Sequence, residues 1–238
     1  MKATKWKSYS LALIAGMSVL TACSSDDNND NGGNGNNGNG NEIENGTTLK
    51  GTITSDVTLT AGSTYKLSGE YIVEDGATLN IEAGVKIISI YDDIVDYILV
   101  KQGGKINAVG TSSAPIVMTS EKEEPGAWGG IHICGKAHTN AEGGKGSSEI
   151  GGATYGGNDD ADNSGTLKYV RVEYSGYAFD SEHEANGITF YGVGNGTTVE
   201  YCQAYKGSDD GFEFFGGSVN VSNCLLYTSP SPRDRSLS

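Results

Sequence analysis

Two short strand patterns repeat along the second half of this chain, and the repeat limits the fold more than any other feature. Three pairs of segments carry it: TLKYVRVEYSG (166–176) with TVEYCQAYKG (198–207), GITFYG (187–192) with GFEFFG (211–216), and TVEY (198–201) with SVNV (218–221). The two patterns alternate with a period near 20 to 24 residues. A period of this size suits a parallel β-solenoid, in which each coil stacks on the one before it. An antiparallel sandwich is the alternative, although it gives less reason for successive segments to be equivalent.

Apolar side chains alternate in short runs from residue 47 onward, which places them on one face of a strand. The clearest pairs are Leu79 and Ile81, Val85 and Ile87, Ile98 and Val100, Ile116 and Met118, and Ile131 and Ile133. No stretch of this part keeps a helical period over three turns. We therefore expect an all-β body over residues 47–223.

The offsets between the repeated segments are unequal. The first pair is 32 residues apart and the second pair is 24 apart, so the earlier coil holds about eight extra residues within YAFDSEHEAN (177–186). Insertions leave a solenoid as loops on one edge, and that edge is where function is usually placed.

Several sequence blocks resemble a family of Bacteroidetes secreted lipoproteins that have a right-handed parallel β-helix. The blocks are AWGGIHICGKA (127–137), GGNDDADNSGTLKYVRVEYSGYAF (156–179) and NGITFYGVGNGTTVEYCQAYKGSDDGFEFFGG (186–217). The resemblance covers roughly residues 53–221 and implies a fold and a location. It implies no established reaction, so no catalytic residues come with it.

The N-terminus has the form of a lipoprotein signal. Three early lysines and a short apolar run precede LTAC, so residues 1–22 read as a signal peptide and Cys23 as the lipidated residue. Residues 23–46 are rich in Asp, Asn and Gly and are expected to form a disordered tether. The acidic cluster after Cys23 resembles an export signal of surface lipoproteins. We predict display on the outer membrane, with its periplasmic face as the alternative.

The charge of the chain limits its partners. There are 30 acidic and 16 basic residues, for a formal net charge of −14. Nucleic acid is excluded as a partner because its phosphates would be repelled. Cations, neutral glycans and basic proteins remain as possible partners.

A candidate calcium loop lies within GGNDDADNSG. Asp160, Asp162 and Ser164 stand at alternate positions before Gly165, as in the first half of an EF-hand loop. Arg171 stands where an EF-hand has its bidentate Glu, so we expect a looser calcium site. A solvated turn rich in Asp and Asn is the alternative.

A second acidic group combines two loops that the repeat places on successive coils. Its members are Asp180, Glu182, Glu184, Asp209 and Asp210. Stacked coils lie about 4.8 Å apart, so these carboxylates would repel one another unless a cation or another ligand bridges them. The group is therefore a candidate cation or ligand edge, and a solubilising charged rim is the alternative.

Other side chains offer weaker functional signals. Arg171 and His183 are candidate bases for a lyase, although each is as well explained as an ion-pair partner. Tyr177 and Tyr205 lie near loops and are candidates for stacking on sugar rings, whereas Trp128 and Tyr169 are expected to pack between coils.

The cysteines and histidines of the body give no complete metal motif. Cys134 lies near His132 and His138, and alternation puts His132 and Cys134 on one strand face. We expect Cys134 and Cys202 to be small buried residues. A zinc site and a disulfide between the two cysteines are the alternatives.

Residues 224–238 differ in composition from the chain before them. They hold two of the four prolines and two of the three arginines. CLLYTSPSPRD (224–234) is also the in-frame translation of the end of a transposase adapter used for sequencing libraries. We interpret residues 224–238 as a non-native tail and residues 47–223 as an incomplete β-helix.

The combined prediction is a lipid-anchored surface β-helix that binds a glycan or extracellular matrix ligand. A polysaccharide-degrading enzyme, either a lyase or a glycoside hydrolase with part of its site beyond residue 223, is the alternative.

Overall fold

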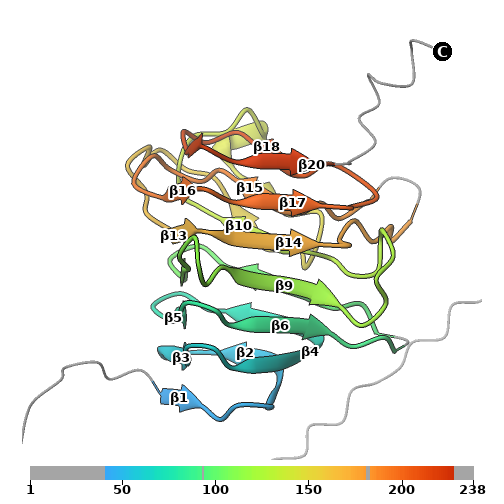
Figure 1. Cartoon of the computed structure of the whole chain (residues 1–238). Helices are drawn as coiled ribbons and strands as arrows, with labels where there is room; N and C mark the ends of the chain where they lie inside the picture. The colour runs from blue at the N-terminus through green and yellow to red at the C-terminus, as the bar shows by residue number, and fades with distance from the viewer. Residues whose placement is uncertain (1–40, 93, 181–182, 228–238) are drawn as a thin grey trace, which may run out of the picture. The chain divides into compact units, whose positions relative to one another are not determined.

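A computed structural model describes residues 41–227 except residues 93 and 181–182, and this part of the chain is a right-handed parallel β-helix (Figure 1). One sheet has seven parallel strands in the order β1 (Asn41–Ile43), β3 (Val57–Leu59), β5 (Thr78–Ile81), β8 (Lys105–Val109), β13 (Gly165–Lys168), β16 (Thr198–Glu200) and β19 (Asn220–Ser222). The prediction of an all-β parallel solenoid is confirmed.

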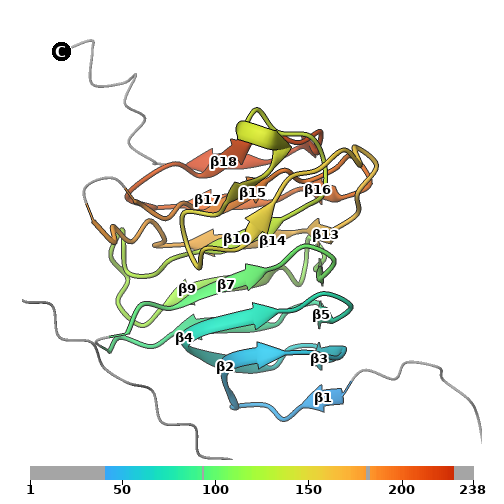
Figure 2. The same ribbon diagram turned by 180° about the vertical axis from the view of Figure 1, so that it is seen from behind.

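The second sheet has eleven strands and divides into two arms at its longest strand, β4 (Thr64–Val73). The first half of β4 pairs with β6 and the second half pairs with β7. The β6 arm contains β6 (Lys86–Ser89), β9 (Ile116–Ser120), β14 (Val170–Glu173), β17 (Gln203–Tyr205) and β20 (Leu225–Tyr227). The β7 arm, seen in Figure 2, contains β7 (Tyr97–Val100), β10 (Ile131–Cys134), β15 (Ile188–Tyr191) and β18 (Phe212–Phe215), and β2 (Thr48–Ile53) pairs with β4.

The core lies between the three strand faces, where equivalent side chains stack from coil to coil. One such column follows the register of the seven-stranded sheet through Leu59, Ile81, Ala108, Leu167, Val199 and Val221. All the predicted apolar pairs are buried in this core. Each fully buried aliphatic side chain contributes about 1.5–3 kcal/mol, so the stack is held mainly by these columns.

The strand register confirms two of the three sequence alignments and corrects the third. Thr166 pairs with Thr198, and Ile188 pairs with Phe212, at the predicted offsets of 32 and 24. Thr198 pairs with Asn220 instead of Ser218, so the last offset is 22 and not 20. A shift of two residues keeps the same side chains on the same face, so alternation alone cannot detect it.

A 30-residue insertion, residues 135–164, leaves the stack between β10 and β13. It carries the 3-10 turn η1 (Glu142–Gly144) and a small hairpin of β11 (Gly146–Ser147) and β12 (Thr154–Tyr155). Ile150, Ala153 and Tyr155 of the insertion form a second apolar cluster with outward side chains of the β7 arm. The insertion thus covers part of the outer face of the β7 arm.

Strands of the described chain extend past both ends of the predicted body, residues 47–223. Asn41–Ile43 belong to the stack, because β1 pairs with β3 and the Tyr65 hydroxyl donates to the Ile43 carbonyl at 2.9 Å. This strand has a single apolar residue, Ile43, so its sequence shows no alternation of apolar and polar residues that would predict a strand. At the other end β20 continues the β6 arm by pairing with β17, and residues 228–238 of the predicted tail lie outside the described residues.

The described residues include no helix that is long and apolar enough to cross a membrane. Cys23 and the predicted signal peptide lie outside the described residues. Lipidation therefore stays a prediction.

Candidate functional site

Loops of unequal length leave the stack where the two arms of the second sheet meet. In β4 the chain passes this corner without a loop, whereas later coils form loops at residues 90–96, 121–130, 174–187 and 206–211. The loop at 174–187 is eight residues longer than the loop at 206–211, as the offsets predicted. The predicted loop edge is therefore present, and two hollows lie along it.

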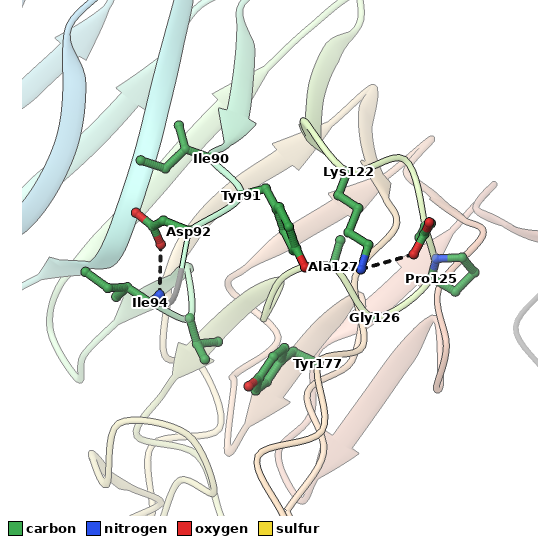
Figure 3. A pocket seen from close by; sticks show the side chains of 11 residues that line it. Ile90, Tyr91, Asp92, Ile94, Lys122, Pro125, Gly126, Ala127 and Tyr177 are labelled. Carbon is green, nitrogen blue, oxygen red and sulfur yellow. Dashed lines mark hydrogen bonds and ion pairs between the residues drawn. The ribbon is translucent and has the colours of Figure 1, made fainter.

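The first hollow, here called the tyrosine hollow, has a volume of about 320 Å³ and is lined by three successive corner loops (Figure 3). Its lining residues are Ile90, Tyr91, Asp92, Ile94, Val95, Lys122, Glu124, Pro125, Gly126, Ala127 and Tyr177. Tyr177, a predicted glycan-binding residue, lines this hollow. Tyr91 and Lys122 are not among the residues that the sequence predicts for a site.

Charged side chains fix the position of Tyr91 at the mouth of the tyrosine hollow. The Tyr91 side chain is 64% exposed, and Lys122 Nζ lies 4.7 Å from its ring centroid. Lys122 Nζ also lies 3.1 Å from Glu124 Oε2, and its hydrogen bond to Glu124 raises the pKa of the lysine. The lysine thus stays charged beside an exposed aromatic ring.

A buried carboxyl group holds the first of these loops against the stack. Asp96 is 1% exposed, and its Oδ1 accepts a hydrogen bond from the backbone N–H of Gly69 in β4. Burial raises the pKa of Asp96 to about 6. The Asp96 end of this loop is therefore held in place, and Tyr91 lies near its other end.

The second hollow, here called the acidic hollow, lies between the insertion and the loop at 174–187. It has a volume of about 230 Å³ and is lined by Tyr97, Glu149, Ile150, Gly151, Phe179, Asp180 and His183. The rings of Phe179 and Tyr177 meet edge to face with centroids 5.1 Å apart. Because Tyr177 lines one hollow and Phe179 the other, this ring pair forms a wall shared by both.

Carboxyl groups from three segments gather beside the acidic hollow. Burial raises the pKa of Glu213 to about 7, and the charges of Glu149, Asp210 and Asp209 add to the rise. Burial raises the pKa of Asp209 to about 6, and the hydrogen bond that the protonated Asp209 donates to Glu184 is the second cause. The structure thus brings the predicted residues Glu184, Asp209 and Asp210 together, and it adds Glu149 and Glu213.

The predicted residues Asp180 and His183 also lie at this hollow. His183 Nδ1 is 2.9 Å from Asp180 Oδ1, and the His183 backbone N–H donates to the same oxygen. Glu182 lies outside the described residues.

A row of buried polar side chains lies on the outer face of the β7 arm. His132 pairs with Thr189, and Thr189 pairs with Glu213, in the strand register. His132 Nε2 is 2.7 Å from the Gly129 carbonyl, and burial lowers the pKa of His132 to about 4. Within the described part of the chain, His132 Nδ1 and Thr189 Oγ1 have no hydrogen-bond partner although both residues are fully buried.

The two acidic side chains of the predicted calcium loop have different hydrogen-bond partners. Asp160 accepts hydrogen bonds from the backbone N–H of His138 and from its ring, with Oδ1 2.6 Å from Nδ1. Asp162 is buried and accepts a hydrogen bond from the Ser164 hydroxyl at 3.1 Å. In the part of the chain that the structure describes, no group of three or more His, Cys, Asp or Glu side chains could hold a metal ion. Calcium binding stays a prediction.

The remaining candidates line neither hollow. Tyr205 is on the outer face of the β6 arm beneath Arg171, whose guanidinium carbon is 4.5 Å from the ring centroid. Arg171 Nε lies 2.6 Å from Glu173 Oε1, so the arginine is an ion-pair partner. Cys134 and Cys202 are both free and buried, Cys134 in the apolar cluster on the outer face of the β7 arm and Cys202 in the main core.

The titration of Glu213 gives a testable dependence of stability on pH. A folded-state pKa raised from 4.5 to about 7 means that deprotonation disfavours the folded state, so stability falls as pH rises through this window. We expect Glu213→Gln to melt at a higher temperature than the parent at pH 8, by roughly 2–4 °C, and to match it near pH 4.5. Glutamine still accepts the hydrogen bond from Asn186.

Melting temperatures measured between pH 4.5 and pH 8 check this expectation. The exposed Glu42→Gln variant is the control and should follow the parent. Equal pH slopes for Glu213→Gln and the parent would show that Glu213 does not carry the predicted proton.

Comparison with known proteins places the fold in a family. The sequence profile described as a pectate-lyase-like beta helix domain matches residues 51–234, well over half of the chain. The chain therefore belongs to the family of pectate-lyase-like β-helix domains. No curated protein and no solved structure matches it.

Proposed function

We propose that this chain is a carbohydrate-binding domain and that the tyrosine hollow holds the glycan. Tyrosine rings offer flat apolar faces for sugar rings, and the charged groups beside them bond to sugar hydroxyls. Tyr91 and Tyr177 supply the rings, and Lys122 supplies the donor. The proposal rests on the presence of two tyrosine rings and a lysine in one hollow, and membership of a pectate-lyase-like family supports it.

Binding is favoured over cleavage because the candidate bases are engaged elsewhere. Arg171 is paired with Glu173 and stacked on Tyr205, outside both hollows. His183 is hydrogen-bonded to Asp180. Lyase chemistry needs a base positioned against the substrate. The described residues that line the tyrosine hollow include no His or Arg, and the hydrogen bond from Lys122 to Glu124 raises the pKa of this lysine, which keeps it charged and makes it a poor base.

We also propose that the domain acts at the cell surface. Lipid at Cys23 would anchor the chain in the outer membrane, and the Asp-, Asn- and Gly-rich residues that follow would hold the β-helix clear of it. Such a tethered domain would capture glycan or matrix ligands outside the cell.

Affinity electrophoresis tests the binding proposal. The protein is run through native gels that contain xylan, laminarin, β-1,4-mannan or glycol chitin, and we expect retardation in at least one. Replacing both Tyr91 and Tyr177 by alanine removes two stacking faces worth about 0.5–1.5 kcal/mol each, so affinity should fall about tenfold or more.

The matched control is Tyr201→Ala. Tyr201 is also a partly exposed tyrosine, at 43%, but it stacks on Tyr169 at a different corner with ring centroids 4.8 Å apart. It should leave retardation unchanged. Full retention by the Tyr91 and Tyr177 double variant, or no retardation of the parent in any gel, would refute the proposal.

A further inference from the structure

We infer that the tyrosine hollow accepts uncharged glycans and rejects glycans that carry carboxylate groups, and that Glu124 sets this preference. The inference rests on the proposed function, because it names the class of glycan that the same hollow takes. The rejected class includes pectate, the polyuronate that appears in the description of the family.

The charged side chains that line the tyrosine hollow have an excess of negative charge. Among the described lining residues, Asp92 and Glu124 are acidic and Lys122 is basic, so two negative charges stand against one positive charge. The whole chain has the same sign, with a formal net charge of −14. A carboxylate that enters the hollow is therefore repelled by the sum of these charges.

Lys122, the side chain that would attract a carboxylate, is already paired. Its Nζ lies 3.1 Å from Glu124 Oε2, an ion pair drawn as a dashed line in Figure 3. Both side chains are partly exposed, so the pair adds little to stability, but its two charges cancel for a third charge placed nearby. A glycan carboxylate would have to displace Glu124, whose own charge would stay in the hollow. The exchange replaces one charge pair by another and adds a repulsion.

An uncharged sugar can use the same side chains without separating the ion pair. The ammonium group of Lys122 has three N–H donors. Nζ bonds to Glu124 and lies 3.5 Å from the Tyr91 hydroxyl oxygen, which leaves a third N–H for a sugar hydroxyl. Asp92 accepts a hydrogen bond from the backbone N–H of Ile94 at 2.8 Å and, as a carboxylate, can accept more from sugar hydroxyls. The hollow thus offers a donor and an acceptor to neutral sugars.

Isothermal titration of the full chain with matched polysaccharides tests the inference. Xylan, laminarin, β-1,4-mannan and glycol chitin are each used in a carboxymethylated and a hydroxyethylated form of equal substitution, so that the two forms differ in charge but have similar added bulk. For each polysaccharide that retards the parent, we expect the carboxymethylated form to bind about tenfold or more weakly at neutral pH. Raising the salt from about 50 to about 500 mM should reduce this difference, because screening weakens the repulsion.

Glu124→Gln tests the role of the carboxylate. It keeps the size of the side chain, removes one negative charge from the hollow and leaves Lys122 charged and unpaired, so the affinity ratio should shift toward the carboxymethylated form by about tenfold. Adding Lys122→Gln removes the freed charge and should return the ratio to that of the parent. Glu123→Gln is the matched control and should leave the ratio unchanged, because Glu123 is the exposed neighbour of Glu124 and is not among the described lining residues.

Each other result contradicts a defined part of the account. Equal binding of the two forms by the parent, or tighter binding of the carboxymethylated form, overturns the inference. The same follows if Glu124→Gln leaves the ratio unchanged or if Glu123→Gln shifts it equally. In these cases the proposed function stands as long as the Tyr91 and Tyr177 double variant still loses retardation. No binding of any form, together with no retardation in any gel, overturns both.

Discussion

Replacing Trp128 by alanine is expected to lower the free energy of unfolding by about 3–5 kcal/mol, the usual cost of truncating a large buried aromatic side chain. Trp128 is 1% exposed and packs in the main core at the corner between the arms. Its Nε1–H donates to the Glu173 carbonyl at 2.7 Å, and an isolated bridge joins it to Ser175. The variant therefore leaves a cavity and an unpaired carbonyl group between two coils.

Urea unfolding followed by circular dichroism measures this loss. Tyr91→Ala is the control, because an exposed loop tyrosine should change stability by no more than about 0.5 kcal/mol. The two variants therefore change different properties: Tyr91→Ala weakens glycan binding, whereas Trp128→Ala lowers the stability of the fold. A Trp128→Ala variant as stable as the parent would mean that this corner is not packed as described.

Gly165→Ala is expected to have an effect at least as large, about 4 kcal/mol or more, because it combines backbone strain with a steric clash. Gly165 opens β13 with φ of +116°, and a Cβ at this position would lie 2.1 Å from the Ile106 carbonyl oxygen. β13 pairs with β8 at this point, so the clash separates two adjacent coils. We expect a large drop in melting temperature or loss of cooperative melting.

Gly76→Ala separates the clash from the strain. Gly76 also has a positive φ, +82°, but a Cβ there meets nothing within 4 Å. It should cost only the strain of a left-handed alanine, about 1–2 kcal/mol. If Gly165→Ala and Gly76→Ala melted at the same temperature, close stacking of β13 on β8 would be contradicted.

The sequence predicted the stacked coils well because the same pattern of apolar positions recurs from coil to coil. Leu167 and Val199 occupy equivalent positions in the repeat, and the structure pairs them directly. The period also located the longer corner loop at 174–187. It failed for the last coil, where the alternation of Val219 and Val221 permits two registers. Tertiary stacking, and not local pattern, decides between such registers.

The site was less predictable because its parts lie outside the repeat. Glu149 comes from the insertion at 135–164, which has no counterpart in other coils, and Glu213 looked like an ordinary outward residue of a strand. Their proximity depends on how the insertion folds back over the β7 arm. Tyr91 follows a strand directly, and its exposure depends on the buried Asp96 that fixes its loop.

Tyr205 shows how sequence position near a loop can mislead. Its position predicts a glycan-binding residue like Tyr177, but the structure places Arg171 over its ring on the outer face of the β6 arm. Tyr177 instead lines a hollow. The two tyrosines therefore give a matched comparison for the central claim.

The most direct test of that claim is isothermal titration of three proteins with one hexasaccharide of the best-retaining polysaccharide. The proteins are the parent chain, the Tyr91→Ala and Tyr177→Ala double variant, and Tyr205→Ala. The account predicts that the double variant loses about tenfold or more in affinity while Tyr205→Ala binds like the parent. Loss of affinity in Tyr205→Ala with full affinity in the double variant would contradict it and place the glycan on the β6 arm.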